Sequence, residues 1–141
     1  MNRLLDRHVV VVVDDEPEVL SALKRSLRAE SCHVLATESP EQALRWVETR
    51  DVSAIVADQR MPGMTGTELL AWVGACSPVT ARIILTGHAA HTSAIPHLKR
   101  WIDCMIGKPW DDAMLRRTIR DFLSERELED MNKEVPEHPK K

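Results

Sequence analysis

The sequence lacks any apolar stretch long enough to cross a membrane. No apolar run is longer than Val9–Val13, which has the length of a strand, whereas a transmembrane helix needs about 20 residues. The first residues of the chain include no apolar core of the kind found in a secretory signal. We therefore expect a cytoplasmic protein that makes no contact with a membrane.

Glycine and cysteine are also scarce, and positive charge is not in excess. Five glycines and eight prolines are too few for a collagen-like or low-complexity chain. The three cysteines, Cys32, Cys76 and Cys104, stand far apart and match no metal motif, so we expect reduced, buried and inert thiols. A formal net charge of −3 gives no electrostatic reason to expect nucleic-acid binding by this domain.

What is present suits one globular domain with a sizeable core. Hydrophobic residues make up 43% and charged residues 29% of the 141 positions. Short, continuous, β-branched runs at His8–Val13, Ala54–Ala57 and Arg82–Leu85 predict buried parallel strands. Weaker runs at Cys32–Ala36 and Asp103–Gly107 predict two more.

Helical patterns separate these strands. The first begins near Pro17, and the next two follow the capping boxes Ser39-Pro-Glu-Gln42 and Thr65-Gly-Thr-Glu68. Asp111 can cap a last helix, whereas Pro96 makes His91–Trp101 the weakest helical pattern. The alternation predicts an α/β fold with a five-stranded parallel sheet, doubly wound, with helices on both faces.

The apolar pattern changes phase after Phe122. Leu128, Met131 and Val135 restart a 3,4 spacing among charged residues. This tail is either a solvated helix that frays or the first turns of a linker. We expect one domain over residues 1–124, followed by a charged C-terminal helix or tail, 125–141, that can link to an output domain.

Polar residues follow the predicted strands at their carboxyl ends. Asp14 and Asp15 follow the first strand, Asp58 the third, Thr86 the fourth and Lys108 the fifth. In an open α/β sheet these ends meet at one edge. Clustered carboxylates repel one another unless a cation lies among them, and hard oxygen ligands suit Mg²⁺. A lysine and a hydroxyl can clamp phosphoryl oxygens, and a carboxylate can be the nucleophile that accepts the phosphoryl group.

With these residues in place, the sequence closely resembles a known family. The segments VVVVVDDEPEVL, IVADQRMPGMTG, IILTGHA and MIGKPW resemble the receiver domain of two-component response regulators, of the chemotaxis-regulator type, over roughly Val9 to Leu123. The resemblance implies the (βα)5 flavodoxin-like receiver fold. It also implies a phospho-acceptor switch, rather than an enzyme, that takes its phosphoryl group from a sensor histidine kinase or a phosphotransfer protein.

The resemblance also implies a magnesium site and an acceptor. Asp58 is similar in position to the phospho-acceptor of the family. Asp15 would bind Mg²⁺ directly and Asp14 through water, together with Asp58 and the backbone carbonyl of Arg60. Thr86 would be the hydroxyl that moves to meet the phosphoryl group.

Further expectations follow the same resemblance. Lys108 would be the phosphoryl partner, and the Lys108–Pro109 peptide is similar to one that is cis in the family. Arg60 and His88 lie at the rim, where we predict that they tune the lifetime of the phosphoryl group. Met105 departs from the family, because Tyr or Phe is common there and this chain has no Tyr. We expect activation to reshape the 91–123 face, through which a homodimer is possible.

Two rival functions have weaker support in the sequence. A phosphatase of the haloacid-dehalogenase type needs a second Asp two residues after its nucleophile, where this chain has Arg60. A flavodoxin-like binding module without phosphotransfer needs a phosphate-cradling loop after the first strand. The segment Asp14-Asp15-Glu16-Pro17 is acidic and would repel a phosphate that lacks a cation.

Overall fold

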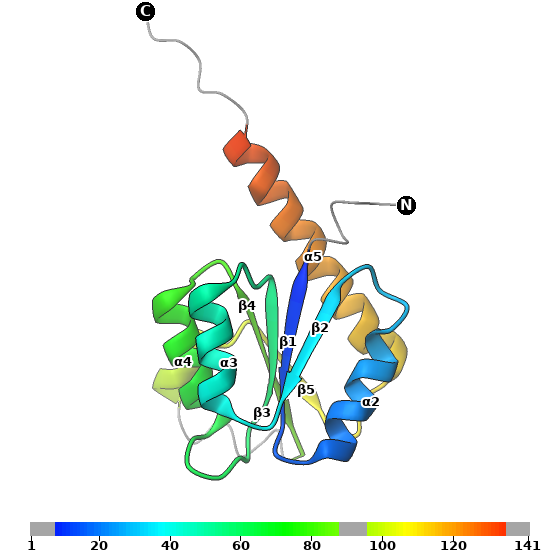
Figure 1. Cartoon of the computed structure of the whole chain (residues 1–141), viewed down its shortest axis with the longest axis vertical. Coiled ribbons are helices and arrows are strands. Elements are labelled where there is room, and N and C mark those ends of the chain that lie inside the picture. The colour runs from blue at the N-terminus through cyan, green and yellow to red at the C-terminus, as the bar shows by residue number, and fades with distance from the viewer. Residues whose placement is uncertain (1–7, 88–95, 135–141) are drawn as a thin grey trace, which may run out of the picture.

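The computed structural model describes residues 8–87 and 96–134. In this part of the chain, five parallel strands form one sheet, as predicted, and their order in the sheet is β2-β1-β3-β4-β5 (Figure 1). Each strand lies within one residue of its predicted ends. The strands are β1 (Val9–Val13), β2 (His33–Thr37), β3 (Ala54–Asp58), β4 (Ala81–Thr86) and β5 (Cys104–Gly107).

Helices cover both faces of the sheet, which confirms the doubly wound fold. α2 (Pro17–Leu27) and α5 (Asp112–Glu134) pack on one face, and α3 (Pro40–Thr49) and α4 (Gly66–Cys76) pack on the other (Figure 1). The position of β1 between the two helical layers explains why its sequence is apolar at every residue instead of alternating with polar residues. Val10 and Val12 enter the core under α2 and α5, whereas Val11 and Val13 enter the core under α3 and α4.

The predicted helix starts are present with one difference. Thr65 and Glu68 form the full capping box at α4, and the Asp111 carboxylate accepts a hydrogen bond from Met114 N at 2.9 Å before α5. At α3 the box is half formed. The Ser39 hydroxyl accepts from Gln42 N at 3.1 Å, but Ser39 N donates to the Thr37 hydroxyl at 3.0 Å.

The crossover from β4 to β5 differs from the predicted helix over His91–Trp101. Its described part is a 3₁₀ helix, η2 (Pro96–Trp101), and residues 88–95 lie outside the described part of the chain. Proline begins this helix rather than interrupting it, because a first helical position needs no N–H donor.

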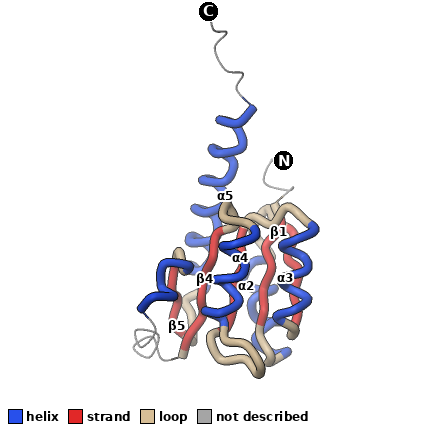
Figure 2. The backbone as a smooth tube through the Cα atoms, turned by 90° about the vertical axis from the view of Figure 1, so that its left-hand side faces the viewer, coloured by secondary structure: helices blue, strands red, loops and turns tan. Residues whose placement is uncertain are grey.

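α5 continues past the sheet as one unbroken helix (Figure 2). It crosses residue 124, where the sequence predicts the end of the domain, and that boundary stays a prediction. Arg126, beyond the predicted boundary, is buried. None of the described helices is both long and apolar enough to span a bilayer.

The cysteines only partly match the expectation of buried thiols. Cys32 and Cys104 are half-buried, but Cys76 is exposed at the end of α4. The expectation was wrong for Cys76, because residue type alone does not place a position on the outer side of a helix. Burial raises the pKa of the Cys32 thiol to about 11, which keeps that thiol protonated at neutral pH.

Candidate functional site

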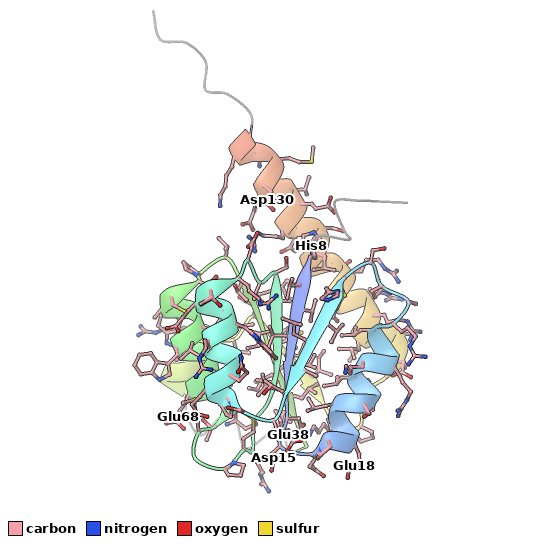
Figure 3. All side chains as sticks on the ribbon, viewed as in Figure 1. His8, Asp15, Glu18, Glu38, Glu68 and Asp130 are labelled. Carbon is pink, nitrogen blue, oxygen red and sulfur yellow. The ribbon has the colours of Figure 1, made fainter. Side chains whose placement is uncertain are left out.

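The strands bring the predicted polar residues to one edge of the sheet. Asp14 directly follows β1, Asp58 ends β3, Thr86 ends β4, and Lys108 directly follows β5. The register of β1 on β3 sets Asp14 level with Asp58. Figure 3 labels Asp15 at this same end of the sheet, opposite the end at which α5 extends away.

Lys108 joins the two buried carboxylates of this edge. Its ammonium lies 2.9 Å from Oδ2 of Asp14 and 2.7 Å from Oδ1 of Asp58. Asp14 is 0% exposed and Asp58 is 6% exposed. Two buried carboxylates therefore share one cation, which leaves this trio with an excess of one formal negative charge.

The pKa shifts reflect burial and this pairing. Burial raises the pKa of Asp14, although hydrogen bonds from Lys108 and from Glu16 N work against the rise. For Lys108, burial alone would lower the pKa. The hydrogen bonds to Asp58 and Asp14 outweigh burial and hold its pKa above the ordinary value. Lys108 therefore stays charged throughout the neutral range.

Asp15 and Glu16 add further carboxylates beside Asp14. Single carboxylate oxygens of Asp14, Asp15 and Glu16 lie within 4.8 Å of one another. Asp15 is half-buried and Glu16 is exposed, so water can reach the cluster. Hard oxygen donors, an excess of negative charge and access for water fit Mg²⁺, which keeps several of its waters in proteins.

Two glycines shape the loop that follows Asp58. Gly63 has a φ of +83°, a left-handed conformation that favours glycine. A Cβ at Gly66 would lie 2.3 Å from the backbone oxygen of Asp58, so only glycine allows this approach. Arg60 lies in the same loop and is exposed, as expected for a residue at the rim.

The remaining predicted residues have mixed outcomes. Thr86 is buried at the end of β4, and its carbonyl accepts a hydrogen bond from Lys108 N at 2.9 Å. The Lys108–Pro109 peptide is cis. Met105 is half-buried and packs against the core under α3 and α4. His88 lies outside the described residues.

Two residues of this region were given no role in the site from the sequence. Glu16 joins the acidic cluster, a role that its place directly after Asp14 and Asp15 could have indicated. The Gln59 side chain binds Thr67 at the start of α4. No local pattern signals that contact.

Comparison with known proteins identifies the family. The model of the response regulator receiver domain family matches residues 10–120, which is most of the chain and contains every residue of this site.

Curated relatives are transcriptional regulators that are longer than this chain. The hydrogenase transcriptional regulatory protein HoxA of Cupriavidus necator is 36% identical over 121 residues, which cover 85% of this chain and 25% of that protein. The transcriptional regulatory protein FixJ of Azorhizobium caulinodans is 32% identical over 114 residues, 81% of this chain and 54% of that protein. The chain thus spans between a quarter and about half of the length of these two relatives.

Solved structures have the same fold. A CheY-like response regulator receiver domain protein from Methanospirillum hungatei is 28% identical, with a TM-score of 0.78, and the match covers 86% of this chain and 98% of that one. The receiver domain of an HD domain-containing protein from Pseudomonas fluorescens is also 28% identical, with a TM-score of 0.78 and coverage of 89% and 93%. The chain therefore belongs to the response regulator receiver domain family and is a receiver of the two-component type.

Proposed function

We propose that Asp58 accepts the phosphoryl group of this receiver. Receiver domains take phosphoryl groups from histidine kinases. An Asp58 carboxylate oxygen would attack the phosphorus of a phosphohistidine, the P–N bond would break, and the imidazole would leave with its electron pair and take up a proton. The observation that carries this proposal is the position of Lys108, whose ammonium lies 2.7 Å from Oδ1 of Asp58.

Lys108 is well placed to act after the transfer. Phosphorylation removes the charge of the Asp58 carboxylate and puts negative charge on the phosphoryl oxygens. An ammonium that is already held beside Asp58 can pair with those oxygens without a large movement. Its raised pKa keeps it protonated for this role. Thr86, at the end of the adjacent strand β4, would add a hydroxyl donor.

Mg²⁺ is the cofactor that the acidic residues support. Asp15, Asp14 through water, Asp58 and the carbonyl of Arg60 would hold it. Bound there, it would neutralise charge between the carboxylates and the incoming phosphoryl group. Because few protein ligands and several waters would complete its shell, we expect weak binding. The flavodoxin-like binding module without phosphotransfer finds no support in the comparisons.

The signal would leave the site through β4 and the segment after it. Movement of Thr86 would displace Gly87 and reshape the 91–123 face, which we propose as the surface for homodimerisation or for a partner. Residues 91–95 of that face lie outside the described residues. We further propose that the chain acts in the cytoplasm as a switch, binds no nucleic acid through this domain, and uses residues 125–141 as a connecting segment.

A labelling experiment tests the acceptor and the metal together. Incubation with radiolabelled acetyl phosphate and Mg²⁺ should label the wild-type protein, and Asp58→Asn should abolish the label. Asp121→Asn, which removes an exposed carboxylate of α5, should label normally. Asp15→Ala should shift labelling to much higher Mg²⁺ concentrations. Persistent labelling of Asp58→Asn, or labelling that needs no Mg²⁺, would contradict the proposal.

A further inference from the structure

Gln59 directly follows the acceptor, and its side chain binds the start of α4. Its Oε1 accepts two hydrogen bonds from Thr67, one from the backbone N at 3.0 Å and one from the hydroxyl at 2.6 Å. Thr67 is 3% exposed. The two donors of Thr67 are held firmly to this half-buried side chain, because loss of the amide oxygen would leave the buried Thr67 hydroxyl and N–H without their acceptor.

Gln59 provides most of the acceptors that the first turn of α4 requires. The first N–H groups of a helix have no partner within the helix. Here Gly66 N donates to the backbone oxygen of Gln59 at 3.0 Å, and Thr67 N donates to its side chain. Only Glu68 N, the third donor, uses the usual cap, the Thr65 hydroxyl, at 3.1 Å. One residue thus binds the helix through both its backbone and its side chain.

The same residue is tied to the sheet beside the acceptor. Gln59 N donates to Leu85 O of β4 at 2.9 Å. Gly66, at the other end of the loop, approaches the Asp58 backbone so closely that a Cβ would lie 2.3 Å from its oxygen. Residues 60–65 therefore form a loop whose two ends are joined directly behind the acceptor. The carbonyl of Arg60 belongs to this loop.

We propose that Gln59 is a positioning residue for the phosphoryl-transfer site. By fastening β3 to α4, it would hold the Asp58 carboxylate and the Arg60 carbonyl at the separation that one metal ion requires. Asp58 needs such support because Lys108 attracts its carboxylate while Asp14 repels it. This inference rests on the proposed function, in which Asp58 and Arg60 serve the same Mg²⁺.

The test measures how phosphorylation by acetyl phosphate depends on Mg²⁺. Gln59→Leu removes the side-chain acceptor at similar volume. It should raise the half-saturating Mg²⁺ concentration by about 10-fold, the lower end of the range for groups that bind a metal ligand directly, because Gln59 acts on the ligands only through the backbone. Thr67→Val keeps the backbone donor and loses only the hydroxyl, so its shift should be smaller. Thr67→Ser keeps both donors and should behave like the wild type.

A double variant tests whether the two side chains act as one unit. Gln59→Leu combined with Thr67→Val should shift the Mg²⁺ dependence no more than Gln59→Leu alone, because the hydroxyl then has no amide to bind. If Gln59→Leu does not fold, Thr67→Val against Thr67→Ser still provides the comparison. An equal Mg²⁺ dependence in those two variants would overturn the inference.

Thr80→Val is the matched control for simple loss of stability. It removes the buried hydroxyl that donates to Val52 O at 2.8 Å, at the amino end of the sheet, and should lower the urea midpoint while leaving the Mg²⁺ dependence unchanged. If Gln59→Leu shifts the Mg²⁺ dependence no more than Thr80→Val, the inference is wrong even though the proposed function stands. If the wild type itself is labelled elsewhere than on Asp58, the proposed function fails first.

Discussion

Each end of the sheet holds one positively charged side chain bound to two carboxylates, but the two clusters differ in how far water and the cation compensate the negative charge. At the carboxyl end, Lys108 lies between Asp14 and Asp58. At the amino end, Arg126 of α5 binds the carboxylates of Asp51 and Asp130. Figure 3 labels Asp130 and Asp15 at these opposite ends.

Burial distinguishes the two clusters. Around Arg126 the cation is buried and its partners are open to water, with side chains 77% exposed at Asp51 and 42% exposed at Asp130. Arg126 also donates to Val52 O at 3.3 Å. Around Lys108 it is the carboxylates that are buried, with side chains 0% and 8% exposed. Water stabilises the acids at the amino end, whereas the carboxyl end retains unbalanced negative charge that a cation can satisfy.

This difference in burial distinguishes the amino end of the sheet, where the charges stabilise the fold, from the carboxyl end, where they form the candidate site. The Arg126 cluster fastens α5 to the sheet with its charges largely satisfied. The Lys108 cluster has an unfavourable electrostatic free energy, because two buried carboxylates share a single ammonium group. Sites that bind a ligand commonly contain such unfavourable interactions, and the bound ligand then removes them. Substitutions at the two ends should therefore respond differently to Mg²⁺.

Lys108→Met should have the largest effect on stability. It leaves Asp14 and Asp58 buried without a cation, so the free energy of unfolding should fall by about 3 kcal/mol at neutral pH. Mg²⁺ should restore part of this loss, since it replaces the missing positive charge. Urea unfolding with and without Mg²⁺ measures both effects. A variant as stable as the wild type without Mg²⁺ would show that Lys108 does not offset the buried acids.

The same variant should change the alkaline limit of stability. Because the folded state raises the pKa of Lys108, its contribution is fully present below the ordinary value of 10.5 and is lost as pH rises through the higher folded-state pKa. The free energy of unfolding of Lys108→Met should therefore not show the decrease at alkaline pH that comes from deprotonation of Lys108.

Arg126→Met should have a smaller effect that Mg²⁺ does not relieve. The variant loses hydrogen bonds to two carboxylates and to Val52 O, but the exposed acids remain solvated, and Thr80 still donates to Val52 O at 2.8 Å. We expect a loss of about 2 kcal/mol in the free energy of unfolding. Arg117→Met, at an exposed position of α5, is the control. Recovery of stability by Mg²⁺ would contradict the separation of the two ends.

His8→Asn should have the smallest effect on stability, and the size of that effect should depend on pH. His8 is buried at the amino end, where Nδ1 lies 2.6 Å from the Ser53 hydroxyl and Nε2 lies 3.9 Å from a Glu127 oxygen. Burial lowers its pKa, and nearby Arg126 lowers it further, whereas Glu127, Asp130 and Asp51 raise it; the net shift is downward.

The sign of the effect follows from that shift. A lowered folded-state pKa means that the contribution of neutral His8 is present above its ordinary pKa of 6.5 and is lost as pH falls through the folded-state value. The stability difference between wild type and His8→Asn should therefore be constant above the ordinary pKa of 6.5 and should shrink as pH falls below it. His33→Asn, at an exposed position, should show no such trend. A constant difference would contradict the assigned shift.

Much of the fold could be predicted because it depends on residues that are near in sequence. Three β-branched runs and two weaker apolar runs marked every strand to within one residue, and Thr65 with Glu68 marked the start of α4. The parallel arrangement then implied that the residues after β1, β3, β4 and β5 share one edge. The meeting of Asp14, Asp58 and Lys108 could thus be predicted, although the ion-pair geometry could not.

Contacts between distant residues were decided only by the tertiary structure. The Trp101 ring lies against Gly74 of α4, where a Cβ would be 2.4 Å from the ring. Arg82 is buried inside β4, because its guanidinium donates to the backbone oxygens of Trp101, Pro78 and Thr80. Neither contact can be predicted from the residues that are close to Trp101 or Arg82 in the sequence.

The sequence by itself determined the order of strands and helices, the acidic edge and the family, because hydrophobic periodicity, caps and motif spacing act over short distances along the chain. The tertiary structure alone decided that Gln59 fastens α4 behind the acceptor and that Arg126 anchors α5 beyond the predicted end of the domain. The physical reason is that a polar side chain is stable in the interior only where a partner is brought to it, and the folded backbone decides which partner that is.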